Sequence, residues 1–167
     1  NDQGTHIMDV VQWYMGQVTP LEADGFGFIK KMIGADCPDV FTATLYYPKF
    51  IATWTINYTS NFMDWWHILF QGEKGTMHLH RFGFQVYLDQ DKEDGKDLPT
   101  KAHIDFKGDL PDEPHIKNFI ECVKSRKEPN APVEIGHQAI CGPHLANVAY
   151  RNQRRAKLDP EATQVTL

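Results

Sequence analysis

The chain has 167 residues and a formal net charge of −5, with 41% hydrophobic and 23% charged residues. This length fits one domain with a sizeable core, and the composition is that of an ordinary globular protein. The net negative charge does not fit a nucleic-acid-binding domain, since such domains carry a basic surface. No apolar run in the sequence is long enough to span a bilayer.

The first predicted element is a helix over residues 5–15. Ile7, Val10, Val11 and Tyr14 recur at helical spacing and form one apolar stripe. We therefore expect this stripe to face the core.

A series of strands is predicted after this helix. β-branched and aromatic residues are frequent in this part of the chain, and glycines separate several of the segments. The predicted strands cover 22–33, 40–47, 50–58, 66–71, 76–80 and 84–88. A charged surface loop over 89–101 and a short edge strand over 102–107 complete this part.

Helices are predicted again in the last third. One starts near Pro114, and a second covers 134–152, where Pro143 should kink the helix or mark a restart. Strands grouped apart from helices predict an α+β fold, with a mostly antiparallel open sheet of about six strands and helices packed on one face. The other face would expose aromatic side chains, so we expect it to join copies into a homodimer or homotetramer.

The cysteines give an expectation about the compartment. Cys37, Cys122 and Cys141 are odd in number, and no pair has metal-ligand spacing. Free thiols in a reducing compartment are therefore expected. This favours the cytoplasm, with an exported parent protein as the alternative.

Three motifs carry a family resemblance. The first sixteen residues, NDQGTHIMDVVQWYMG, place Asp2, His6 and Asp9 in the order Asp, three residues, His, two residues, Asp. The turn GEKGTMHL at 72–79 and the closing stretch 115–151 follow. In this order they resemble the C-terminal domain of the glucose–fructose oxidoreductase / inositol dehydrogenase / rhizopine catabolism (Gfo/Idh/MocA) family.

The resemblance implies a parent enzyme that is an NAD(P)-dependent oxidoreductase acting on a sugar, polyol or derivative. The family's N-terminal Rossmann domain carries Gly-x-Gly-x-x-Gly after a strand and Glu-Lys-Pro, and this sequence contains neither motif. We therefore expect residues 1–167 to be a single substrate-binding and oligomerisation domain, inactive without its Rossmann domain. NAD or NADP would be bound mainly by the missing domain, with none expected on this chain alone.

The predicted catalytic residues are His6 and Asp2. One face of the predicted helix carries residues at i, i+4, i+7 and i+11, namely Asp2, His6, Asp9 and Trp13. Carboxylates one turn away on each side favour the imidazolium and orient the ring. Oxidation of a secondary alcohol requires loss of the hydroxyl proton as hydride leaves the carbon, and His6 could take that proton. The resemblance implies the same role, while the alternative is a helix-terminal histidine beside a capping Asp.

Four further residues are predicted to bind substrate. Asp9 could hydrogen-bond a sugar hydroxyl or be a solvated helix residue. Trp13 could stack on a sugar ring or belong to the core. Trp66 and Arg81 could line a polyol pocket, or serve the core or an oligomer interface.

A His-x-His pair gives no metal prediction. His78 and His80 point the same way on a strand, and with His67 they could bind a metal ion. Exposed strand histidines are the more common explanation, so we predict no metal site.

Two alternative functions stay open from the sequence. The domain could be an oligomerisation module without a catalytic role, or part of a nicotinamide-dependent glycosidase. The expected partner in the oxidoreductase hypothesis is a small sugar or polyol, with neither nucleic acid nor a membrane involved.

Overall fold

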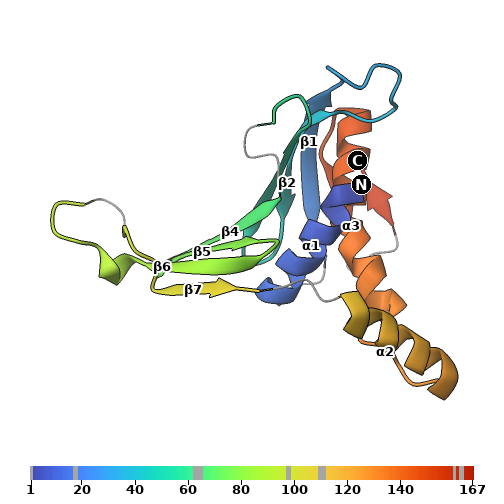
Figure 1. The fold of residues 1–167 in the computed structure, drawn as a ribbon. Helices are drawn as coiled ribbons and strands as arrows, with labels where there is room; N and C mark the ends of the chain where they lie inside the picture. Colours follow the sequence, from blue (N-terminus) through green and yellow to red (C-terminus); the bar gives the residue numbers. More distant parts are fainter. Residues whose placement is uncertain are drawn as a thin grey trace. The chain divides into compact units, whose positions relative to one another are not determined.

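The computed structural model describes residues 2–16, 19–61, 66–96, 99–108, 112–159, 161 and 164–167 (Figure 1). The chain forms two compact units: unit 1 combines Asn1–Asp64 with Ala131–Leu167, and unit 2 is Trp65–Asn130. None of the helices in these described ranges is both long and apolar enough to cross a membrane. The expectation of a single domain over residues 1–167 stays a prediction.

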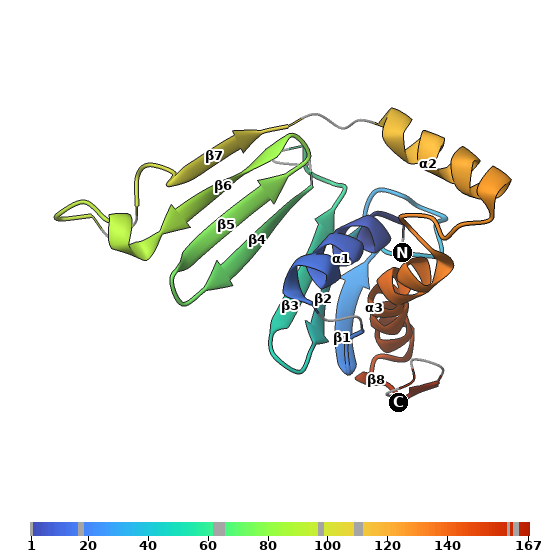
Figure 2. The same cartoon turned by 90° about the horizontal axis from the view of Figure 1, so that it is seen from below.

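Unit 1 is a pair of helices packed on an antiparallel sheet, sheet A. Its helices are α1 (Asp2–Met15) and α3 (Val133–Asn152). In sheet order, its strands are β3 (Ile51–Asn57), β2 (Val40–Tyr46), β1 (Glu22–Phe28), β8 (Ala156–Leu158) and β9 (Val165–Thr166). Helix α1 packs on α3, which packs on β1, β2 and β8 (Figure 2).

Unit 2 contains a second antiparallel sheet, sheet B, and one helix. In sheet order, its strands are β4 (His67–Gly72), β5 (Gly75–His80), β6 (Gly83–Leu88) and β7 (Ile104–Lys107). The short 3₁₀ helix η1 covers Asp89–Asp91, and α2 covers Asp112–Ser125. Gly75 and Gly83, which begin β5 and β6, have φ angles of 154° and 147°, a region that favours glycine.

The predicted α+β class with open antiparallel sheets is confirmed. Two details differ from the sequence-based expectation. The strands divide between two sheets, because sheet A ends at β3 and sheet B begins at β4. The short strands β8 and β9 were not predicted, since β8 forms by pairing with the distant β1.

The core of unit 1 lies between the helices and the inner face of sheet A. Strand β2 alternates between buried and more exposed residues, as expected for a sheet covered on one side. The largest buried apolar side chains of this core are Met8, Phe41, Leu45, Tyr47, Trp54 and Leu145. Helix α3 continues through the buried Pro143 and does not restart there. Packing around Gly142 and Pro143 offsets the helical hydrogen bond that proline removes.

A buried glutamine fixes the orientation of α1. Gln12 is 7% exposed, and its Nε2 donates to Tyr47 Oη at 3.3 Å and to the Gln138 carbonyl at 3.2 Å. Because both partners accept hydrogen bonds from the amide nitrogen, this polar group can lie inside. The buried face therefore differs from the predicted apolar stripe, and comprises Gly4, Met8, Val11 and Gln12. Tyr14 of the predicted stripe is 48% exposed.

The first turn of α1 lies directly on Trp54. A Cβ atom at Gly4 would come within 2.5 Å of Trp54 Cη2 and Cζ2. The indole is 6% exposed and packs edge-to-face on Phe41, with ring centroids 5.3 Å apart. Only glycine allows the helix to approach the sheet this closely.

The connection between β1 and β2 is fixed by a buried carboxylate. Asp39 accepts the backbone N–H groups of Lys30, Lys31 and Met32 at 2.8, 2.6 and 2.7 Å. The hydrogen bond from Met32, supported by the other two, holds the pKa of Asp39 below its usual value although burial acts the other way. The loop therefore has a defined backbone even though Ile33 is exposed.

A charged cluster ties β8 to β1 on the outer face of sheet A. Arg155 Nη2 lies 2.7 Å from Asp24 Oδ2, and Nη1 lies 3.2 Å from Glu22 Oε2. The guanidinium also stacks over Tyr46, 4.7 Å from the ring centroid. Hydrogen bonds from Arg155 lower the pKa of Asp24. The outer face of sheet A is thus polar at this end.

We predict that Gly4→Ala destabilises unit 1. The new Cβ would overlap the Trp54 ring, which is buried and packed on Phe41, so we expect a loss of about 1–3 kcal/mol. Gly136→Ala in α3 is the matched control, because nothing lies within 4 Å of its Cβ position. Its helix propensity should give a gain of up to about 1 kcal/mol. Urea unfolding measures both, and equal free energies of unfolding would contradict the proposed close contact.

Candidate functional site

The candidate site lies on the side of α1 that faces away from sheet A. With Gly4, Met8 and Gln12 buried, His6 is exposed on the opposite side of the helix. Asp2 is the first residue of α1, but its side chain lies outside the described part of the structure. The predicted catalytic helix is therefore present, and its imidazole is accessible.

Asp9 interacts electrostatically with His6, one helical turn away. Its side chain is half-buried, and this burial raises the pKa of the carboxyl group, while the charge of His6 acts in the opposite direction. A carboxyl group with a raised pKa beside an accessible imidazole is typical of sites that hold or move protons. The arrangement can thus support acid–base chemistry.

Trp13 extends the same side of α1. It is 78% exposed, so the alternative of a core tryptophan is wrong. Its ring packs edge-to-face on Tyr14, with centroids 5.5 Å apart and planes at 73°. The sequence placed Tyr14 in the core stripe. Only its position in the last turn of the helix, two residues before Gly16, indicated that it could leave the core.

Trp66 and Arg81 belong to unit 2, whereas His6 belongs to unit 1. Trp66 is half-buried and immediately precedes β4. Arg81 is exposed in the turn between β5 and β6. Their proposed contact with substrate stays a prediction.

Three histidines cluster on sheet B. The rings of His67 and His78 have centroids 5.4 Å apart, and those of His78 and His80 are 5.6 Å apart. Burial, followed by the charges of His67 and His80, lowers the pKa of His78. The backbone N–H of Phe82 donates to His80 Nδ1 at 3.2 Å. Across the described ranges, no group of three or more His, Cys, Asp or Glu side chains is arranged to hold a metal ion.

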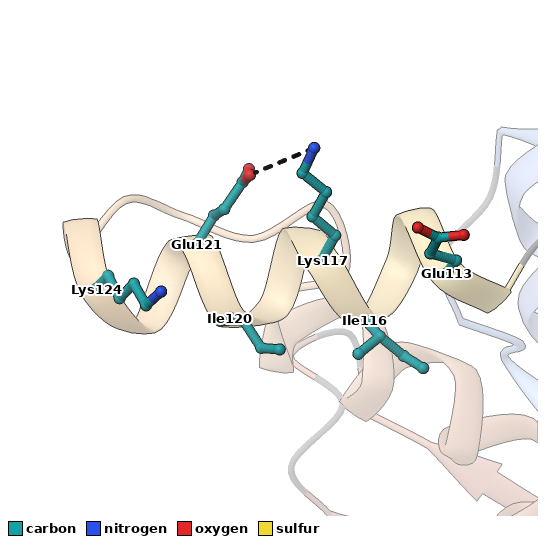
Figure 3. Close-up of a pocket in the computed structure, with 6 residues that line it drawn as sticks. All are labelled: Glu113, Ile116, Lys117, Ile120, Glu121 and Lys124. Atoms are coloured by element: carbon teal, nitrogen blue, oxygen red, sulfur yellow. Dashed lines mark ion pairs between the residues drawn. The ribbon is translucent and has the colours of Figure 1, made fainter.

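Helix α2 presents a shallow surface that does not enclose a small molecule. Figure 3 shows Ile116 and Ile120 on one side of the helix and the pair Lys117–Glu121 on another. The ion pair has an N–O distance of 3.9 Å and is exposed. Because every lining residue comes from this one helix, the surface cannot enclose a small molecule.

The residues of this chain do not fit a dinucleotide by themselves. A pyrophosphate is normally held by a glycine-rich turn that joins a strand to the start of a helix. The sequence contains no Gly-x-Gly-x-x-Gly segment.

Residues 1–78 match the GFO/IDH/MocA C-terminal domain. No curated protein sequence gives a match.

Solved structures share the fold at low sequence identity. UDP-N-acetylglucosamine 3-dehydrogenase GnnA from Acidithiobacillus ferrooxidans has a TM-score of 0.67 at 11% identity, covering 89% of this chain and 46% of its own. The WlbA dehydrogenase from Bordetella pertussis, in complex with NADH and UDP-GlcNAcA, has a TM-score of 0.58 at 14% identity, covering 93% and 43%. An NAD-binding protein from Listeria innocua has a TM-score of 0.62 at 15% identity, covering 93% and 50%.

This chain spans about half the length of the solved structures that it matches. At these identities the structural likeness concerns the fold, while the sequence match covers α1, strands β1 to β4 and the first part of β5. The resemblance inferred from the Asp2, His6 and Asp9 pattern is thus confirmed over residues 1–78, which match the GFO/IDH/MocA C-terminal domain.

Proposed function

We propose that this chain is the substrate-side domain of an NAD(P)-dependent oxidoreductase acting on a sugar, a polyol or a derivative of either. The observation that carries the proposal is the accessible His6 beside the half-buried Asp9 on the outward side of α1. Both residues lie in the segment that matches the family. Two structural relatives are named as dehydrogenases of sugar nucleotides or crystallised with one, which favours a sugar derivative as substrate.

In this proposal His6 accepts the proton of the substrate hydroxyl as the adjacent carbon is oxidised. Asp2, one turn earlier in the sequence, completes the catalytic set, and Asp9 hydrogen-bonds a substrate hydroxyl or balances the charge of His6. Trp13 offers an exposed ring face on which a sugar ring can stack. Trp66 and Arg81 would contribute further substrate contacts from unit 2.

The cofactor, NAD or NADP, would be bound by an N-terminal Rossmann domain of the parent protein. Residues 1–167 would then act as one substrate-binding and oligomerisation domain, whose copies associate through a sheet face. The polar groups on α1 support binding of a hydroxylated substrate, and the lack of a Gly-x-Gly-x-x-Gly segment in this sequence favours a cofactor site on another domain. The isolated chain is accordingly expected to be inactive.

The isolated chain should not bind NADH tightly. We expect titration of the 167-residue chain to leave the fluorescence of NADH unchanged up to high micromolar concentrations. The same titration on a protein that includes the preceding nucleotide-binding half serves as the positive control. Saturable binding to the isolated chain would contradict the assignment of the cofactor to the missing domain.

His6→Asn should abolish most turnover in a protein that joins this chain to its nucleotide-binding half. Loss of a general base is expected to lower kcat by about 10²–10⁴-fold. His144→Asn is the matched control, because His144 is also exposed on a helix of unit 1 but lies on α3. Unchanged kcat in His6→Asn with an intact oligomer would instead favour the oligomerisation module without a catalytic role.

Asp9→Asn should stabilise the fold at neutral pH while it lowers activity. Burial raises the pKa of Asp9, so the ionised carboxylate is less favourable in the folded than in the unfolded chain. This cost is present above the folded pKa and disappears as the pH falls below the unfolded pKa, near 3.8. The stabilisation should therefore be visible at pH 7 and vanish in acid. Urea unfolding at several pH values measures the difference in free energy of unfolding between Asp9→Asn and the wild type. A lower free energy of unfolding for the variant at pH 7 would contradict the prediction.

A further inference from the structure

Three histidines form an imidazole cluster on one face of sheet B. His67 on β4 lies directly opposite His80 on β5, and His78 lies two residues before His80. Side chains that are opposite each other, or two residues apart on one strand, point to the same face. The ring centroids are 5.4 Å apart for His67 and His78 and 5.6 Å apart for His78 and His80. All three side chains are half-buried, so charging them together is costly.

His80 makes a hydrogen bond that requires a neutral ring. The backbone N–H of Phe82 donates to its Nδ1 at 3.2 Å in the turn that joins β5 to β6. A protonated imidazole carries a hydrogen on both ring nitrogens and is a donor only. Protonation at Nδ1 would therefore place two N–H groups against each other and break this contact. The turn between β5 and β6 is thus stabilised by the neutral form of His80.

The other strands of sheet B do not offer the cluster a direct counter-charge. The further ionisable side chains on this face of the described strands are Tyr87 on β6 and Asp105 and Lys107 on β7. The residue opposite His78 is Gln85, whose Nε2 donates to Asp105 Oδ1 at 3.1 Å. An amide therefore lies between the imidazole and the carboxylate. Arg81, exposed in the turn after His80, adds a positive charge. Within the described ranges, only strands of sheet B pack extensively on β4 and β5.

The surroundings of His78 already disfavour its charged form. Burial is the main cause, and the charges of His67 and His80 act in the same direction, so the pKa of His78 lies below its usual value of 6.5. The unfolded chain consequently binds more protons than the folded chain as the pH falls through 6.5. The stability that neutral His78 provides is therefore fully present above this pH and is lost as the pH drops towards the lower pKa of the folded state.

We propose that the imidazole cluster is an acid-sensitive switch, which keeps sheet B closed at neutral pH and loosens it when the histidines are protonated. The three imidazolium groups would repel one another, and the hydrogen bond from Phe82 to His80 would be lost in the same step. Like charges on facing strands lower the equilibrium constant for pairing by about 1.5- to 5-fold per pair. This conformational device does not rest on the proposed oxidoreductase function.

Unit 1 provides an internal comparison for the switch. Its histidines, His6, His137 and His144, are exposed residues of α1 and α3, and sheet A carries none in its described strands. Protonation in unit 1 therefore brings no facing charges together between strands. The acid response should be confined to sheet B.

Hydrogen–deuterium exchange of the 167-residue chain tests the proposal. Spectra are compared at about pH 7.5 and about pH 5.5, on either side of the ordinary histidine pKa, after correction for the intrinsic exchange rate. Protection of the β4 and β5 amides should fall by at least about fivefold in acid. Protection of β1 and β2 should change by less than about twofold, because no imidazole cluster lies on them.

A double variant removes the switch and keeps the turn. His78→Gln deletes the central charge, and His80→Asn retains an oxygen that can accept the N–H two residues later, as in an Asx turn. In this variant the protection of β4 and β5 should stay within about twofold between the two pH values. His115→Gln is the matched control, because His115 is exposed on α2 in the same unit, and it should respond to acid as the wild type does.

Two checks make every result decisive. Far-UV circular dichroism at about pH 7.5 shows whether the double variant is folded. If it is not, NMR titration of the wild type decides, and His78 should titrate at a lower pH in the folded chain than in the urea-unfolded chain. The proposal would be overturned by a His78 that titrates no lower when folded, by equal acid responses of the two sheets, or by a folded double variant that loosens like the wild type. None of these measurements uses NAD or substrate, so their outcome is independent of the proposed function.

Discussion

The close contact between the first turn of α1 and the indole of Trp54 is the constraint on which the candidate site depends. Glycine at position 4 removes the side chain that would separate helix and sheet. At the other end of α1, Gln12 is fixed by Tyr47 and the Gln138 carbonyl. A helix held at both ends has little freedom to rotate about its axis. The side that carries His6 therefore always faces away from the core.

The outward side of α1 combines features that do not favour stability. A half-buried carboxyl group at Asp9 is less easily ionised than one in water, and an exposed tryptophan at position 13 leaves a large apolar surface hydrated. Unfavourable local features of this kind are common where a site binds or transforms a ligand. Asp9 lies one helical turn from His6 and Trp13 lies two turns from it, so the three side chains can act in one site.

Local sequence patterns were sufficient for much of this structure and insufficient where distant segments meet. β-branched residues predicted β2 and β3, and the Asp2–His6 spacing predicted one face of α1. The burial of Gln12 depends on partners 35 and 126 residues away, which no local pattern encodes. Trp66 lies in a different compact unit from His6, and hydrophobic periodicity does not encode this division.

The salt-bridge cluster around Arg155 has a consequence for how the chain acquires its structure during synthesis. Asp24 and Arg155 are separated by 131 positions, and the whole of unit 2 lies between them. Until the ribosome has added the last segment, Glu22 and Asp24 project from β1 as two uncompensated negative charges. Unit 2 is continuous in sequence and can form its hairpins early, because local pairings close quickly. Unit 1, whose first segment is synthesised before unit 2, therefore reaches its complete structure only after unit 2 has been synthesised.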